Sequence, residues 1–347
     1  MLDATAVRMR AEPGRGLYES FYFRGTSPDG NHAFWLKHNM LRYRGSGEVW
    51  LEAALVLFDR AANRTSAVYS HEAMGADRFA RMAEQATDWD HVALQMPNGT
   101  SVQIGRNLLG GELAGEGGHA RWDLQVRRSG LTLVHYPHAW MYRLPWPDNK
   151  VVTRDCHVDF HGSVWAGNLA FSGTFHGMNG HNWGSGHTHA YAYANCAEFD
   201  GREGVYFDGF SSRVAVAGGM FVTPFLSMAY LHTGSRWHRF NRLRRAAAHT
   251  VSRFDDYGWR AELTNRTHRL VVDIDGATPA VLPWIALHYG HPDRKRSVVK
   301  NTKFASLRLR LMRNDGTLED EFSSQVCELE TLLPGNRPAG EGFLGTA

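Results

Sequence analysis

The chain has 347 residues, of which 43% are hydrophobic and 12% aromatic, and this composition excludes a disordered chain. A prior of about 150 residues per domain predicts two domains, each long enough to bury a core without disulfides or metals. Lysine and arginine total 38 against 35 aspartate and glutamate residues, and the net charge of +3 gives no indication of nucleic-acid binding.

The cysteines and the N-terminal residues indicate the environment of the protein. Cys156, Cys196 and Cys327 are an odd number without a C-x-x-C pair, so we expect three reduced thiols in a cytoplasmic protein. Residues 1–16 lack the apolar segment of a signal peptide, and no run of about 18 apolar residues predicts a transmembrane segment. Peripheral contact with a membrane and the oligomeric state stay open.

Short strands with period-two hydrophobicity dominate the chain, and Gly, Pro, Asn and Asp turns separate them. Turns at Ser27–Gly30, Pro97–Gly99 and Ser129–Gly130 predict β-hairpins, and helices are expected over 71–87 and 240–249. Regularly spaced short strands are typical of a sandwich or barrel, and no G-x-G-x-x-G or P-loop supports a nucleotide fold. The expected strands are residues 21–26, 32–40, 49–58, 92–96, 101–104, 121–127, 131–135, 151–160, 168–175, 188–196, 204–211, 220–231, 269–274 and 306–312.

The boundary between two domains is expected near Leu144–Asn149. Two prolines and a turn dipeptide follow an aromatic-rich segment there, a composition typical of a linker. We therefore predict an N-terminal domain over residues 1–145 and a C-terminal domain over residues 146–347.

The segment from Met178 to Cys196 differs from the rest of the chain. Its second half alternates strictly, so small residues share one strand face and polar residues the other. A row of polar aromatic side chains indicates a partly apolar cavity that still makes hydrogen bonds, although an outer face covered by another element would have the same pattern. The residues of the polar face are His187, His189, Tyr191, Tyr193 and Asn195.

The following strand carries a carboxylate on a comparable face. Tyr206 and Asp208 come close to Tyr191 and Tyr193 if the two strands pair through the turn at Asp200–Gly201. A buried aspartate beside tyrosine and histidine can keep its proton near neutral pH, as general-acid catalysis requires, whereas the alternative is a surface or turn carboxylate.

A metal site is a weaker interpretation of the same segment. His181, His187 and His189 could present three imidazoles, but the carboxylate expected about four residues after the second histidine of a cupin-like site is absent. Nucleophilic catalysis has less support, because no serine lies in G-x-S-x-G. Three further histidines in strand-like segments are interpreted as structural: His157, His161 and His176.

The motif Gly180-His181-Asn182-Trp183-Gly184 resembles the carotenoid 1,2-hydratase family and its AttH-like and tocopherol-cyclase-like relatives. The segments Glu19–Arg24, Ala33–Leu36 and Tyr136–Pro147 are similar to the first strands and the domain junction of that family. The resemblance implies a mostly β fold of two tandem lipocalin-like antiparallel β-barrel domains with a few short helices.

The resemblance also implies catalytic residues. In the hydratase branch a His-x-Trp pair is followed by a Tyr-x-Asp pair, which His181, Trp183, Tyr206 and Asp208 match in this sequence. The additional row of histidines and tyrosines departs from the family pattern and argues against a carotenoid as the substrate. Because one fold hosts different reactions, the resemblance alone does not determine the chemistry.

We therefore expect a cofactor-independent enzyme whose partner is a hydrophobic, isoprenoid- or polyketide-like small molecule. Asp208 would protonate a C=C bond, Tyr206 and His181 would orient it or relay the proton, and Trp183 would face the developing carbocation. Hydration, isomerisation and cyclisation stay open as outcomes. The expected substrate-binding residues are Tyr191, Tyr193, His187, His189, Asn195 and Asn179.

Two alternatives from other classes stay open: a non-catalytic lipocalin-like carrier, and a metal-dependent enzyme with histidine ligands. The geometric expectation of the enzyme hypothesis is a single pocket inside or at the mouth of the second barrel. It would be lined by His181, Trp183, Tyr191, Tyr193, Tyr206 and Asp208.

Overall fold

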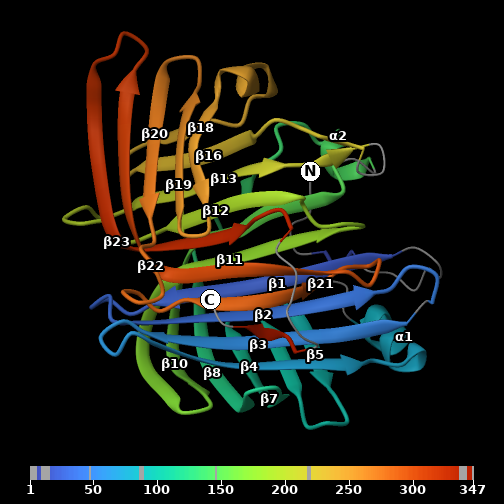
Figure 1. Cartoon of the computed structure of the whole chain (residues 1–347). Coiled ribbons are helices and arrows are strands. Elements are labelled where there is room, and N and C mark those ends of the chain that lie inside the picture. The colour runs from blue at the N-terminus through green and yellow to red at the C-terminus, as the bar shows by residue number, and fades with distance from the viewer. Residues whose placement is uncertain are drawn as a thin grey trace.

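A computed structural model describes residues 6–8, 16–46, 48–85, 90–144, 147–216, 220–335 and 342–345. Two large antiparallel sheets, each curled into a half-barrel, carry most of this structure (Figure 1). The described helices are short: α1 (Ala76–Gln85), α2 (Trp140–Arg143) and the 3₁₀ helix η2 (Leu243–Ala248). The predicted fold class, mostly β with two antiparallel β units and few short helices, is confirmed.

The first sheet has 11 strands in the described part of the chain. In sheet order they are β4 (Arg64–Ala73), β3 (Val49–Asp59), β2 (His32–Arg42), β1 (Leu17–Thr26), β11 (Leu169–Gly184), β10 (Asn149–Ala166), β8 (Gly118–Arg128), β7 (Leu108–Gly115), β6 (Ser101–Gly105) and β5 (His91–Gln95), with β9 (Leu133–Val134) paired to β10.

The second sheet also has 11 strands among the described residues. In sheet order they are β17 (Trp237–Arg239), β16 (Leu226–Thr233), β13 (Val205–Arg213), β12 (Ala190–Cys196), β23 (Leu318–Leu332), β22 (Arg296–Arg313), β20 (His268–Asp275), β19 (Gly258–Thr264) and β18 (Thr250–Asp255), with β21 (Ile285–Gly290) between β22 and β24 (Leu344–Gly345). A separate ribbon pairs β14 (Ala215–Val216) with β15 (Phe221–Val222).

The first sheet extends past the expected domain boundary. Strand β11 pairs with β1 from Tyr18 opposite Gly184 to Thr26 opposite His176, and β10 lies on its other side. The chain therefore leaves the first sheet after Gly184. Residues 145 and 146 lie outside the described residues, and the division into domains stays a prediction.

Two local predictions are wrong for reasons of strand pairing. The turn at Ser129–Gly130 does not form the expected hairpin, because β8 pairs with β7 and β10 while β9 pairs only with β10. Helix α1 begins at Ala76, not His71, because residues 71–73 continue β4 and hydrogen-bond to β3. Thr87, the expected end of that helix, lies outside the described residues.

Each sheet buries an apolar inner face. Phe21, Phe34 and Leu55 belong to the core of the first sheet, and Ala192 and Ala194 to the core of the second. The expectation that the alanine face of the 188–196 strand is a packing face is therefore confirmed.

The opposite faces of the two sheets meet. Trp35 and Phe58 on strands of the first sheet pack against Leu287 and Phe304 of the second, and all four side chains are buried. Where the sheets meet, side chains on these faces enter the space between the sheets, whereas farther away, as at Arg308, they are exposed. No helix in the described ranges is long and apolar enough to cross a membrane.

Candidate functional site

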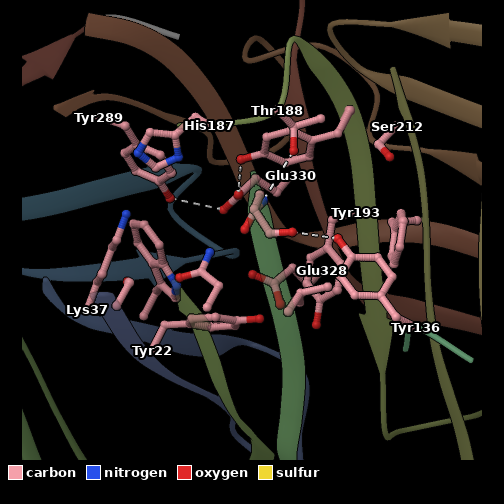
Figure 2. A pocket seen from close by; sticks show the side chains of 17 residues that line it. Tyr22, Lys37, Tyr136, His187, Thr188, Tyr193, Ser212, Tyr289, Glu328 and Glu330 are labelled. Atoms are coloured by element: carbon pink, nitrogen blue, oxygen red, sulfur yellow. Dashed lines mark hydrogen bonds between the residues drawn. The ribbon is translucent and has the colours of Figure 1, made fainter. Parts of the chain in front are cut away.

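A cavity of about 90 Å³ lies between the two sheets. Its walls come from β1, β2, β10 and β11 of the first sheet and from β12, β13, β21 and β23 of the second, together with Tyr136, His187 and Thr188 from connecting segments (Figure 2). The expected pocket is inside or at the mouth of the second barrel, whereas this cavity lies between the two sheets, on the outer face of the second. The polar face of β12 points away from the core of its own sheet and toward the first sheet.

Three of the predicted substrate-binding residues line this cavity: His187, Tyr191 and Tyr193. The His187 ring stacks on Tyr18 at 4.0 Å between centroids, and its Nε2 lies 3.1 Å from the carbonyl oxygen of Gly290. Burial, with help from His291, lowers the pKa of His187 well below its usual range. The imidazole is therefore neutral at neutral pH.

The expected hairpin through Asp200–Gly201 is confirmed, and so is its register. Strands β12 and β13 pair with Asn195 opposite Asp208 and Tyr193 opposite Phe210. Because directly opposed residues share a sheet face, Asp208 lies on the face of Tyr193. It is fully buried, but it lies behind the cavity wall rather than in it.

The carboxylate of Asp208 gathers hydrogen bonds from both sheets. Its Oδ1 lies 2.8 Å from Nε2 of His135, and burial lowers the pKa of this histidine even though Asp208 opposes the shift. Its Oδ2 accepts bonds from Thr153 at 2.6 Å and from Tyr193 at 3.3 Å. The same oxygen accepts further bonds from Asn195 at 3.0 Å and Tyr206 at 3.2 Å. Of these donors, only Tyr193 also lines the cavity.

The structure separates His181, Trp183 and Asn179 from this group. They alternate along β11 with Asn182, which lines the cavity, and so they point to the other face of the strand. There His181 lies 3.0 Å from the Glu19 carboxylate and stacks on Phe21. The predicted set of six residues therefore does not share one pocket.

The surroundings of Trp183 and Asn179 differ from the predicted roles. The guanidinium of Arg8 lies 4.9 Å from the centroid of the Trp183 ring, so a cation of the protein itself occupies that face. Both polar atoms of the Asn179 side chain are buried without a hydrogen-bond partner among the described residues. Catalytic or binding roles for these residues stay predictions.

His189 lies before the first residue of β12 and is exposed. With His181 facing Glu19 and His187 in the cavity wall, the three histidines of the metal hypothesis point in three directions. Among the described residues, the group within metal-ligand distance is His157, Asp159 and His176, with ligand atoms within 4.8 Å of one another.

Two glutamates of β23 line the cavity and were not found by sequence reasoning. Tyr191 donates a hydrogen bond to Oε1 of Glu330, and Tyr289 and Asn301 donate to Oε2 at 3.2 and 2.9 Å. Burial and the charge of Glu328 raise the pKa of Glu330, and the bond from Tyr191 opposes them only in part. This carboxyl is the acid that the cavity presents to a ligand.

Glu328 is compensated by cations from both sheets. Nε of Arg24 on β1 lies 2.9 Å from its Oε2, and Lys303 on β22 donates to its Oε1. Arg24 also donates to the Asn195 side chain, which links this group to Asp208. Burial raises the pKa of Glu328, but Lys303 and Arg24 overcome that effect and leave it lowered.

The local sequence contains little that would identify these glutamates. Glu328 and Glu330 alternate with Cys327 and Leu329, a pattern typical of a strand with one face in water. Lys37 on β2 likewise alternates with Leu36, and this pattern predicts a solvent-facing side chain. Only the packing of one sheet on the other places these charges in a cavity.

No protein-family model matches the chain, and no curated protein matches it. A solved structure of a candidate AttH protein from Nitrosomonas europaea is similar, with a TM-score of 0.49, 12% identity and coverage of 94% of this chain and 98% of that chain. Kievitone hydratase from Nectria haematococca is similar with a TM-score of 0.43, 6% identity and coverage of 96% and 94%. At these values neither similarity carries an argument about function.

Proposed function

We propose that the protein is a cofactor-independent enzyme that protonates a C=C bond of a small lipophilic molecule held between the two sheets. The observation that carries this proposal is the Glu330 carboxyl, which lines the cavity, is held by Tyr191 and Tyr289, and has a raised pKa. A raised pKa favours the protonated form of the carboxyl, which general-acid catalysis of an unactivated bond needs.

The reaction balances with water as the second reactant. Glu330 gives its proton to one carbon of the double bond, and the aromatic ring of Tyr22 in the cavity wall stabilises the positive charge on the other carbon. Water attacks that carbon, and its released proton returns to the Glu330 carboxylate. Loss of a proton instead would give an isomer, and capture by a group of the substrate would give a ring.

Hydration is the favoured outcome for two reasons. The Tyr-x-Asp motif beside the cavity resembles that of the carotenoid hydratase branch, whereas the His-x-Trp motif points away from the cavity. In addition, a cavity of about 90 Å³ exceeds the roughly 10–15 Å³ that one water needs, but it is below the roughly 300–1,000 Å³ of pockets for drug-sized ligands. It suits the reacting end of a molecule together with water.

In this mechanism Asp208 positions the hydroxyl of Tyr193. It accepts a hydrogen bond from Tyr193 and is itself held by His135 and Thr153, so it fixes the direction of the Tyr193 hydroxyl. Burial and the charge of Asp208 raise the pKa of Tyr193 well above its usual range. Tyr193 therefore stays a neutral phenol that can orient the attacking water.

The test is conversion of a lipophilic metabolite extract by purified protein in heavy-oxygen water. A hydratase gives a product heavier by one labelled water, and Glu330→Gln reduces its rate by about 10²–10⁴-fold. Glu321→Gln, on the same strand but 37% exposed, is the matched control and keeps the wild-type rate.

Three outcomes would contradict the proposal. If Glu330→Gln converted the substrate at the wild-type rate, Glu330 could not be the proton donor. Loss of conversion in a chelator, restored by a divalent metal, would favour the metal-dependent alternative. A compound that binds to wild type and variant and leaves unchanged would favour the carrier.

A further inference from the structure

We infer that the ligand of the cavity carries an anionic oxygen, such as a carboxylate or an ionised enol, which pairs with Lys37. This inference deepens the proposed function by naming the substrate class, and it rests on that function in taking Glu330 as protonated. Lys37 lies in the cavity wall, and no described carboxylate forms an ion pair with it.

Lys37 lies in the middle of β2 and enters the space between the sheets. Its neighbour Leu36 points into the core of the first sheet, whereas Lys37 and Trp35 line the cavity. The Nζ of Lys37 lies 3.2 Å from the centroid of the Tyr289 ring. In the described part of the chain it makes no hydrogen bond and no ion pair, so an aromatic face is its nearest partner.

Lys37 is half-buried, and the two fully buried cations beside the cavity are compensated differently. Arg24 and Lys303 both contact the Glu328 carboxylate, whose two oxygens are thereby occupied. Burial lowers the pKa of Lys37 to about 8, an effect that Glu330 and Glu52 oppose only in part. No described anion contacts Lys37, and the charge of Glu330, when this carboxyl is ionised, is one of the two that hold the pKa of Lys37 up.

The charge of Glu330 acts on Lys37 without an ion-pair contact between the two groups. Its oxygens accept hydrogen bonds from Tyr191, Tyr289 and Asn301, and no ion pair joins it to Lys37. When Glu330 holds the proton that the mechanism requires, Lys37 is the unmatched charge of the cavity. Removing a charge from water is costly unless it is paired, and an anionic oxygen of the ligand would provide the missing pair.

The arrangement also predicts the orientation of the ligand. Figure 2 shows Lys37 and Tyr289 on one side of Glu330 and Tyr193 and Tyr136 on the other. An acidic oxygen at Lys37 therefore places the apolar part of the ligand toward Tyr193 and Tyr136. The double bond would then lie next to the Glu330 carboxyl, where proton transfer is needed.

The test compares crotonate with crotonamide, which have the same carbon skeleton and differ in charge. We expect wild-type protein at pH 7 to bind crotonate at least about ten-fold more tightly in an NMR titration, because a hydrogen bond to a charged group contributes that much. Lys37→Met removes the preference. Lys295→Met, at a lysine whose side chain is 78% exposed, keeps it.

Lys37→Arg and the pH dependence distinguish loss of the charge at position 37 from misfolding of Lys37→Met. The preference should fall as pH rises through about 8, because Lys37 loses its charge, and Lys37→Arg should retain it to higher pH. The titratable groups whose charges act on Lys37 or that lie beside it are Tyr289, Glu330, Glu52, His187 and His291.

The inference and the proposed function can fail separately. Glu330→Gln should lose turnover and keep the preference for crotonate, since Lys37 is unchanged. Equal binding of crotonate and crotonamide by wild type, or a preference that survives in Lys37→Met, would overturn the inference and leave the proton donor in place.

Discussion

Replacement of Glu328 by glutamine should destabilise the protein strongly. Glu328 is 1% exposed and lies between Arg24 of the first sheet and Lys303 of the second. Glutamine keeps the volume of the side chain but removes its charge, so two buried cations lose their counter-ion. Breaking a buried ion pair from one side costs about 3–5 kcal/mol, because the remaining charge stays in a poorly solvated environment.

The same strand offers a matched control. Glu321 pairs with Arg308 at 2.9 Å, the distance at which Glu328 meets Arg24, but these side chains are 37% and 62% exposed. An exposed pair contributes about 0–1 kcal/mol, so Glu321→Gln should leave stability almost unchanged. The distance is equal in the two pairs, so the expected difference comes from burial and from the second cation, Lys303, that Glu328 holds.

Urea unfolding and thermal melting of the two variants measure this difference. With about 2–4 °C per kcal/mol for a large cooperative unit, Glu328→Gln should melt about 6–20 °C below wild type. Because the folded-state pKa of Glu328 is lowered, its stabilisation is present above the unfolded pKa and is lost as pH falls through the folded value. Equal unfolding free energies for the two variants would refute the assignment of a buried charge network between the sheets.

Three further predictions concern single residues in or near the cavity or the cores. Thr153→Val should lower the free energy of unfolding in urea by about 1–3 kcal/mol, because it removes a 2.6 Å hydrogen bond to buried Asp208. An unchanged free energy of unfolding would contradict that hydrogen bond. A Cβ on Gly180 would lie 2.1 Å from the Tyr22 ring, so Gly180→Ala should displace that ring and weaken binding to the cavity in the NMR titration, whereas unchanged affinity would argue against Tyr22 as a wall. Burial lowers the pKa of His38 to about 3, so this histidine alone should cost the wild type about 2 kcal/mol of stability between pH 7 and pH 5, because the unfolded chain takes up a proton there. Other buried histidines with lowered pKa values add to the loss, so His38→Leu should reduce the total pH dependence by that amount, and an unchanged slope would contradict the reasoning.

Local patterns in the sequence predicted the parts of the site that depend on neighbouring strands. Strict alternation from Tyr191 to Cys196 placed the tyrosines on one face, and the Asp200–Gly201 turn placed Asp208 beside them. Both inferences use only the pleat of a strand and the geometry of one hairpin. They needed no information about the rest of the fold.

The sequence did not predict that His181 and Trp183 lie outside the cavity between the sheets. Both precede β12 closely in the chain, and proximity in sequence suggested a shared pocket. The chain instead changes sheets between Gly184 and Ala190, so residues on the two sides of this connection belong to different sheets. A strand in another sheet has its own register, and β11 turns Asn182 rather than His181 toward the cavity.

The acid and the cation of the cavity could not be found from the sequence for a related reason. Glu330 and Lys37 lie near opposite ends of the chain, and each occupies the outer face of its own sheet, where charged residues ordinarily meet water. Their chemistry arises only because the two outer faces pack on each other, which lowers the pKa of the amine and raises the pKa of the carboxyl. A half-barrel on its own would leave both groups solvated with ordinary proton affinities. The proposed proton transfer and the recognition of an anionic ligand are therefore properties of the contact between the sheets.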